Sequence, residues 1–185
     1  LVDEDCTEEE LQPQSPYAVT KLKEEGLVQQ LVKDRGLRAS IFRFGTIFGV
    51  SPGMRFHTAV NKFCWQAAMG QPITVWSAAY DQKRPYLDLG DACSAITHII
   101  KNDLFDGRVY NVLSLNATVR EVVDTIMRFV PNLEVQFVDS KIMNQMSYEV
   151  SDQRFCGTGF RSEGSLSASI KEEICLLLSG KTNEV

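Results

Sequence analysis

Two side chains near the start of the chain, Tyr17 and Lys21, have the types and the spacing for proton transfer. Residues four apart in a helix lie on the same face, so we expect the phenol and the ammonium to act together. A free phenol has a pKa of about 10 and is a poor base at neutral pH, although a neighbouring ammonium favours the phenolate. Lowering such a pKa to about 7 requires about 4 kcal/mol, more than one exposed ammonium supplies. A second cation, such as an oxidised nicotinamide, must therefore contribute.

The segment around this pair has the start and stop signals of a helix. Ser15 is a hydroxyl cap, Pro16 suits the first helical position, and Gly36 follows the last turn. We therefore expect an active-site helix near 15–35. Tyrosine and lysine at this spacing also occur by chance on many solvated helices, so the pair needs support from the rest of the chain.

Apolar periodicity alternates between helical and strand-like segments, which is typical of α/β proteins. The pattern predicts strands at 37–44, 73–76, 83–87, 108–112 and 133–138, and a functional loop at 45–49. It predicts helices at 56–69, at 90–101, from a capping box at 118–121 to Pro131, and at 165–178. In the last helix an apolar stripe is expected, with Lys171, Glu172 and Glu173 outside it; the stripe consists of Leu166, Ile170, Ile174 and Leu177.

Composition excludes several classes of protein. The 185 residues are 44% hydrophobic and 23% charged, which suits a packed core. Nineteen basic and 24 acidic residues give a net charge of −5, so we expect neither nucleic acid nor a membrane surface as a partner. No apolar run approaches the roughly 20 residues of a membrane span, and we expect a cytoplasmic protein. The five scattered cysteines and two distant histidines indicate neither disulfides nor a metal site.

Five segments form an ordered set of motifs over most of the chain. They are P-Q-S-P-Y-A-V-T-K at 13–21 with Glu24 or Glu25 downstream, R-F-G-T-I-F-G at 43–49, G-Q-P-I-T-V at 70–75, Q-K-R-P-Y-L-D-L-G-D at 82–91, and S-Y-E-V-S at 147–151 with Gly159 and Phe160. Together they resemble the extended short-chain dehydrogenase/reductases, which are NAD-dependent nucleotide-sugar epimerases and dehydratases. Five matches in the right order are far more specific than any one of them.

The resemblance implies an α/β fold: the C-terminal part of a Rossmann-like, doubly wound parallel sheet with a small α/β substrate-binding lobe. Segments of this lobe are expected near 50–90 and 113–185. The family's glycine-rich turn, which binds the dinucleotide phosphates, lies upstream in relatives and does not occur in this sequence. We therefore expect residues 1–185 to be the C-terminal portion of such an enzyme, without its N-terminal dinucleotide-binding part.

The same resemblance implies roles for the candidate catalytic and cofactor-binding residues. Tyr17 is expected to be the general acid/base that exchanges a proton with a sugar hydroxyl, and Lys21 to hold the nicotinamide ribose and lower the tyrosine pKa. Gly45 occupies a position that lines the cofactor. The cofactor is expected to be NAD, with NADP not excluded, because the residues that discriminate between them lie upstream.

Substrate residues are implied as well. Arg84 occupies the position of an arginine that binds a substrate phosphate, and Arg55 is either a second anion contact or a surface charge. Thr46 is a substrate-side position where the family usually has asparagine, and Pro85 stands where it usually has aspartate. The positions that line the sugar-nucleotide pocket in relatives are Ala59, Val60 and Asn61.

The expected function is therefore that of an NAD-dependent nucleotide-sugar epimerase or dehydratase-like enzyme, inactive as an isolated chain. Relatives often dimerise through the tyrosine-bearing helix, which implies a homodimer. Two alternatives stay open: a carbonyl reductase of the same superfamily, and a non-catalytic dinucleotide-binding relative or inactive fragment.

Overall fold

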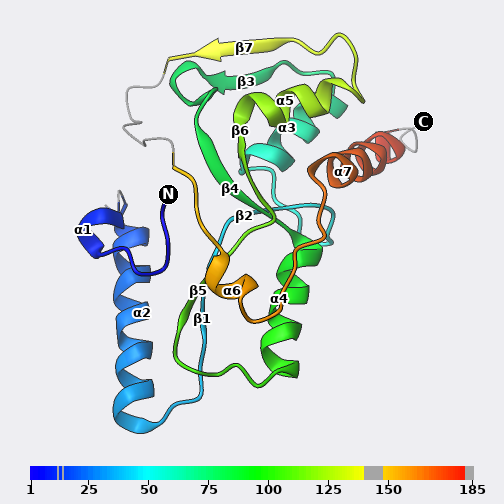
Figure 1. Cartoon of the computed structure of the whole chain (residues 1–185). Helices are drawn as coiled ribbons and strands as arrows, with labels where there is room; N and C mark the ends of the chain where they lie inside the picture. The colour runs from blue at the N-terminus through cyan, green and yellow to red at the C-terminus, as the bar shows by residue number, and fades with distance from the viewer. Residues whose placement is uncertain (12, 14, 140–147, 182–185) are drawn as a thin grey trace.

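A computed structural model describes residues 1–11, 13, 15–139 and 148–181 of the chain (Figure 1). The helices are α1 (Glu8–Leu11), α2 (Pro16–Arg35), α3 (Ala59–Ala68), η1 (Ser77–Ala79), α4 (Leu89–Lys101), α5 (Val119–Met127), α6 (Gln153–Cys156) and α7 (Leu166–Lys181). The strands are β1 (Ile41–Phe44), β2 (Thr46–Phe48), β3 (Ile73–Trp76), β4 (Lys83–Asp88), β5 (Val109–Val112), β6 (Leu115–Thr118) and β7 (Val135–Val138). Residue Ser147 of the last motif lies outside the described residues, as do 140–146 and 182–185 of the expected lobe.

Helix α2 begins and ends where its caps predict. Ser15 Oγ accepts a hydrogen bond from the Ala18 N–H at 3.1 Å, and Pro16 occupies the first turn. Gly36 follows the helix with φ of 66°, a left-handed conformation that favours glycine. The predicted helix is thus confirmed. None of its residues is buried, and the homodimer expected through this helix stays a prediction.

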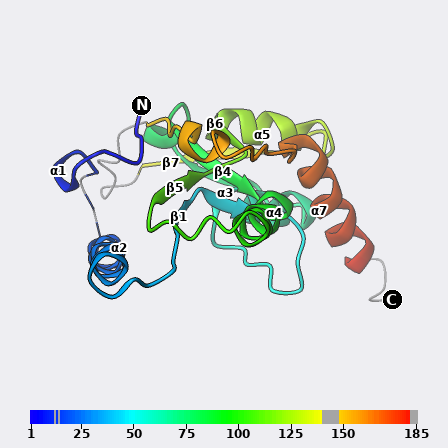
Figure 2. The same cartoon turned by 60° about the horizontal axis from the view of Figure 1, so that its bottom comes forward.

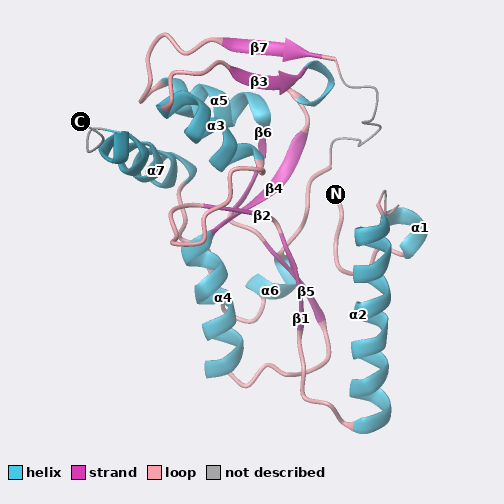
Figure 3. Cartoon of the chain, turned by 180° about the vertical axis from the view of Figure 1, so that it is seen from behind, coloured by secondary structure: helices cyan, strands magenta, loops and turns pink. Residues whose placement is uncertain are grey.

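Parallel strand pairs confirm the predicted α/β class. β1 pairs with β5, β2 with β4, and β3 with β7, all in parallel, while β6 joins β4 antiparallel. Figures 1 and 2 show α2 on one side of the β1–β5 pair and α4 on the other. Seen from behind in Figure 3, the β3–β7 pair lies at the far end of the molecule, beside α3 and α5. This is a part of a doubly wound sheet with a smaller lobe attached.

The region around Gly45 differs from the prediction. The strand expected at 37–44 begins only at Ile41, and the expected loop at 45–49 contains the short strand β2. β2 forms because residues 46–48 pair with residues 86–88 of β4, and β6, which was not predicted, also exists by pairing with β4. Such partners lie far apart in the sequence, so local periodicity does not reveal them.

Two helices are shorter than predicted. Helix α3 begins at Ala59 instead of Phe56, with Thr58 in an extended conformation as its N-cap. Helix α5 begins at the predicted capping box, in which Thr118 and Glu121 exchange side-chain and backbone hydrogen bonds. It ends at Met127, ahead of Pro131, because the following residues form tighter turns.

The larger core lies where α3, α5 and α7 pack together. The apolar stripe predicted in α7 is confirmed by the burial of Leu166, Ile170 and Ile174 and the packing of Leu177. Glu173 was expected outside the stripe, and this is wrong, since its exposed fraction is 0%. Helix α7 packs against two helices rather than one and therefore buries a wider arc than a single stripe. Cys64 of α3, also fully buried, interacts with the Glu173 carboxyl.

Burial raises the pKa of Glu173 to about 7 from its usual 4.5, and the Cys64 thiol opposes this only in part. The folded protein therefore holds a proton on Glu173 at pH values where the unfolded chain has released it. Stability from this group is fully present below the unfolded pKa and declines as pH rises through the folded pKa.

Glu173→Gln should remove this decline. In the wild-type protein we expect Glu173 to lower the free energy of unfolding by about 3 kcal/mol between about pH 4.5 and 7. The glutamine variant keeps the shape without the charge, so above about pH 7 it should be more stable than the wild type. Urea unfolding across this range measures the effect, with Glu172→Gln, an exposed neighbour, as the control. An unchanged pH slope in Glu173→Gln would contradict the prediction.

Candidate active site

Tyr17 and Lys21 lie together on the first turns of α2. The Lys21 ammonium is 5.7 Å from the centre of the Tyr17 ring, and the Tyr17 side chain is 71% exposed. The predicted shared face is confirmed by this contact. Their roles in proton transfer and cofactor binding stay predictions.

Lys21 is also paired with Glu24, whose carboxylate accepts a hydrogen bond from Nζ at 2.6 Å. This hydrogen bond and the charge of Glu24 raise the pKa of Lys21 above its usual value. Both side chains are 54% exposed, so water and salt screen the pair. Lys21 is therefore positively charged at neutral pH, and its ion pair with Glu24 is weak.

Glu25, the next residue, turns this face of α2 toward β1. Arg43 donates from Nε and Nη2 to the two carboxylate oxygens of Glu25, at 2.9 and 2.6 Å. The two side chains are 22% and 14% exposed, so the pair is largely shielded from solvent. Residues 17, 21 and 25 are spaced by four and share one helix face. The contact of Glu25 therefore joins this part of α2 to β1, while the Tyr17 and Lys21 side chains themselves stay exposed.

Gly45 lies where β1 ends, beside the end of β5. Its N–H donates to the Val112 carbonyl at 2.9 Å, and a Cβ here would lie 3.1 Å from the Pro85 backbone, so a side chain would displace β4. A cavity of about 170 Å³, which we call the Gly45 cavity, opens at this point and is also lined by Arg43 and Asn111. Arg43 Nη1 is buried without a hydrogen-bond partner in the described part of the chain. Ligand sites of doubly wound sheets form at such carboxyl ends.

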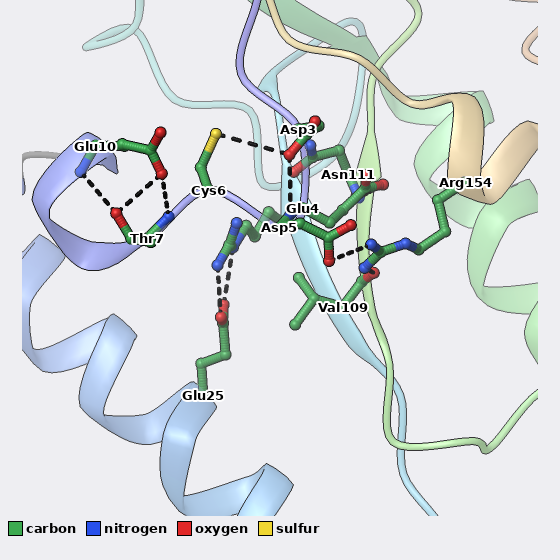
Figure 4. A network of polar contacts seen from close by, with 11 residues as sticks. Asp3, Glu4, Asp5, Cys6, Thr7, Glu10, Glu25, Val109, Asn111 and Arg154 are labelled. Atoms are coloured by element: carbon green, nitrogen blue, oxygen red, sulfur yellow. Dashed lines mark hydrogen bonds and ion pairs between the residues drawn. The ribbon is translucent and has the colours of Figure 1, made fainter.

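The segment ahead of α1 forms one wall of the Gly45 cavity, and Figure 4 shows how it is held. The Glu4 carboxylate, 8% exposed, accepts the Asn111 N–H at 2.9 Å. Asp5 pairs with Arg154 at 2.5 Å. Glu4 and Asn111 are 107 positions apart, and nothing in their spacing predicts the contact. These acidic residues fix the segment against β5.

A larger pocket of about 380 Å³, the Arg84 pocket, is lined by residues of α3, β3 and β4. Its size falls within the range of small-molecule sites. Three predicted substrate residues line it: Thr46, Ala59 and Arg84. Further lining residues were not predicted: His57, Lys62 and Trp76 match no motif, and Tyr148 lies in the S-Y-E-V-S motif, to which the resemblance gave no site role.

The wall of the Arg84 pocket is cationic. Lys62 and Arg84 line it, and within the described residues no carboxylate does. Two neutral acceptors orient the Arg84 guanidinium: the Lys83 carbonyl at 2.9 Å and Gln82 Oε1 at 2.8 Å. A guanidinium oriented in this way, with an ammonium in the same wall, suits an anion such as a phosphate group.

The other three predicted substrate residues do not line the Arg84 pocket. Val60 has an exposed fraction of 0% and belongs to the core. Asn61 accepts the Gly49 N–H and donates to the Arg55 carbonyl, each at 3.3 Å. The Arg55 side chain is exposed. Asn61 therefore holds the loop between β2 and α3 in place.

Tyr17 and Lys21 line neither of these two cavities and lie on the adjoining helix α2. The parallel strand pairs with helices beside them define a protein of the doubly wound α/β class. The chain matches the model of the NAD dependent epimerase/dehydratase family over residues 2–112, more than half of its length. The chain therefore belongs to the NAD-dependent epimerase/dehydratase family.

Similar proteins agree with this membership. UDP-sulfoquinovose synthase of the Spinacia oleracea chloroplast is 29% identical over 134 residues, which are 63% of this chain and 28% of that protein. The structure of RMD from Pseudomonas aeruginosa, in complex with NADPH, has a TM-score of 0.76 and 25% identity, covering 95% of this chain and 60% of that one. UDP-glucuronic acid 4-epimerase from Bacillus cereus, in complex with UDP-glucuronic acid and NAD, has a TM-score of 0.79 and 20% identity, covering 90% and 54%. The chain thus spans little more than a quarter of the synthase and just over half of these two structures.

Three further observations concern membrane spans, metal sites and disulfides. A helix long and apolar enough to cross a membrane is not found among the described residues. Within the same ranges, no group of three or more His, Cys, Asp or Glu side chains is placed to hold a metal ion. All five cysteines are free.

Glu25→Gln should destabilise the protein, whereas Glu24→Gln should not. Removing the Glu25 charge leaves the shielded Arg43 guanidinium unpaired, which we expect to lower the free energy of unfolding by about 2 kcal/mol. Glu24 forms only an exposed pair, so its loss should have little effect. Urea unfolding of both variants tests this. Equal destabilisation by the two neighbouring substitutions would rule out the orienting contact.

Proposed function

We propose that this chain forms the substrate-binding and acid/base part of an NAD-dependent nucleotide-sugar epimerase or dehydratase. One observation carries the proposal: the cationic Arg84 pocket adjoins the Gly45 cavity at Tyr148, and the Arg43–Glu25 pair joins β1, whose end lines that cavity, to the helix that carries Tyr17 and Lys21. The proposal therefore assigns anion binding to the Arg84 pocket and proton transfer to the helix that the ion pair joins to β1. Family membership and the nucleotide-sugar relatives support the same assignment.

Tyr17 is proposed to take a proton from a sugar hydroxyl and to return it later, as the general acid/base. Lys21 stabilises the phenolate by its charge, and its Nζ donors suit the ribose hydroxyls of the cofactor. To bind that ribose, Lys21 exchanges its exposed partner Glu24 for the cofactor. The nicotinamide, when bound, supplies reversible hydride transfer at a sugar carbon.

The residues at the Gly45 cavity fit the nicotinamide end of a dinucleotide. Among the residues that the structure describes, the buried Arg43 Nη1 has no acceptor, and Gly45 places no side chain over the strand end. About 170 Å³ is too little for a whole dinucleotide, since ligand pockets usually exceed about 300 Å³. A G-x-x-G-x-x-G turn for the phosphates does not occur in the sequence. We therefore propose that residues outside this chain bind the rest of the NAD.

On the substrate side, Arg84 is proposed to bind the diphosphate, with Lys62 as a second cation in the same wall. Thr46 and Ala59 line the pocket and are proposed to contact the nucleotide sugar. Arg55, Val60 and Asn61 act at most indirectly, by shaping the loop before α3.

Tyr17→Phe tests the acid/base role. In the complete protein, supplied with NAD and candidate nucleotide sugars, we expect turnover to fall at least about 100-fold, because no other group transfers the proton. Tyr80→Phe, which removes a hydroxyl outside both cavities, should retain activity. Turnover of Tyr17→Phe close to the wild-type value would refute the assignment. Stoichiometric consumption of reduced nicotinamide by the wild type would instead favour the carbonyl reductase.

Arg84→Ala tests the substrate side. Loss of a charge-assisted contact with a phosphate should weaken UDP binding about tenfold in isothermal titration calorimetry. Arg55→Ala should bind UDP like the wild type, because Arg55 does not line the pocket. The reverse result, with Arg55→Ala impaired and Arg84→Ala unchanged, would transfer the anion contact to Arg55.

A further inference from the structure

Tyr148 stands between the two cavities. It lines both the Arg84 pocket and the Gly45 cavity, and among the described residues no other side chain lines both. Its side chain is 40% exposed. An aromatic ring in this position separates the proposed anion site from the proposed reaction site.

The backbone around Tyr148 is held on two sides. The Tyr148 N–H donates to the Lys83 carbonyl at 3.4 Å, and Glu149 forms an ion pair with the Lys83 side chain. Val150 exchanges two hydrogen bonds with the Asn116 side chain, each at 3.0 Å. On the other side, the Val2 N–H donates to the Glu149 carbonyl at 2.7 Å. The place of the ring is therefore set by β4, β6 and the segment ahead of α1.

The ring of Tyr148 contacts the guanidinium of Arg84. The Arg84 Cζ atom is 5.0 Å from the ring centre, which is the geometry of a cation–π contact. Gln82 and the Lys83 carbonyl bind the guanidinium edge through Nη2 and Nη1. With its edge bonded and its face covered, the guanidinium has little freedom to rotate.

We infer that Tyr148 is a positioning residue: its ring holds the Arg84 guanidinium in the orientation that binds the substrate diphosphate. This inference rests on the proposed function, in which Arg84 binds that group. It assigns to the aromatic ring, and not to the phenolic hydroxyl, a share of the affinity for nucleoside diphosphates. A wall residue that merely filled space would act independently of Arg84.

The test is a double-mutant cycle on UDP binding, measured by isothermal titration calorimetry on the chain. Tyr148→Leu removes the ring and should weaken UDP binding about two- to fivefold, the share of a cation–π contact. Tyr148→Phe keeps the ring and should bind within about twofold of the wild type. In the Arg84→Ala background, Tyr148→Leu should cause no further loss, because the group that it positions is gone.

Tyr80→Leu is the matched control. Tyr80 carries the same kind of contact, with Arg120 Cζ 4.4 Å from its ring centre, but lines neither cavity. It should lose stability to urea without losing affinity for UDP. This separates a general cost of removing an arginine–tyrosine contact from an effect on the pocket.

The outcomes distinguish the two proposals. Additive losses for Tyr148→Leu and Arg84→Ala, or a Tyr148→Phe variant as weak as Tyr148→Leu, overturn the positioning role alone. Wild-type affinity in Tyr148→Leu, with Arg84→Ala impaired, does the same. A wild-type protein that binds none of UDP, dTDP, GDP, CDP and ADP overturns the proposed function, and the role of Tyr148 with it.

Discussion

The Arg43–Glu25 ion pair is the constraint that joins helix α2, which has no fully buried residue, to the strand that ends beside Gly45. The residues of α2 that face the rest of the molecule are only half-buried, so its packing is shallow and the ion pair adds a directional contact. A bidentate arginine–carboxylate pair fixes rotation as well as distance, since two parallel hydrogen bonds must align together. Glu25 shares its helix face with Tyr17 and Lys21, and Arg43 precedes Gly45 closely on β1. One contact thus relates the helix that carries Tyr17 and Lys21 to the strand end.

Gly45 explains why the two cavities are neighbours in this fold. The strands on its two sides belong to different sheets, β1 with β5 and β2 with β4. The chain crosses from one sheet to the other within a single residue, so close to Pro85 that a Cβ would lie 3.1 Å from its backbone. The end of β1 consequently opens toward the lobe built from α3 and β3. The small cavity at the strand end and the larger cationic pocket therefore share a wall at Tyr148.

Sequence patterns predicted the parts of this structure that depend on local chemistry. Caps and turns act over a few residues, so the limits of α2 and the start of α5 were readable from Ser15, Gly36 and Thr118. Motif order assigned six residues to the substrate side, of which half line the Arg84 pocket, namely Thr46, Ala59 and Arg84. The strands β2 and β6, the contact of Glu4 with Asn111 and the burial of Glu173 depend on partners distant in the sequence. These features could not be predicted, because apolar periodicity identifies the buried face of a helix or strand but not the segment that packs against it.

The net charge of −5 is compatible with a cationic pocket, because charges act mainly on their near surroundings. Exposed charges are screened beyond about 8 Å at physiological ionic strength, so acidic residues on distant surfaces contribute little within a partly enclosed cavity. The charge inside the pocket is set by the residues of its wall. Lys62 and Arg84 line that wall, and no carboxylate is found among the described lining residues. A surrounding of low polarisability strengthens their attraction for an anion. A protein with a negative net charge can therefore bind a doubly charged phosphate group. The charge of the pocket wall, rather than the net charge of the chain, predicts the charge of the ligand.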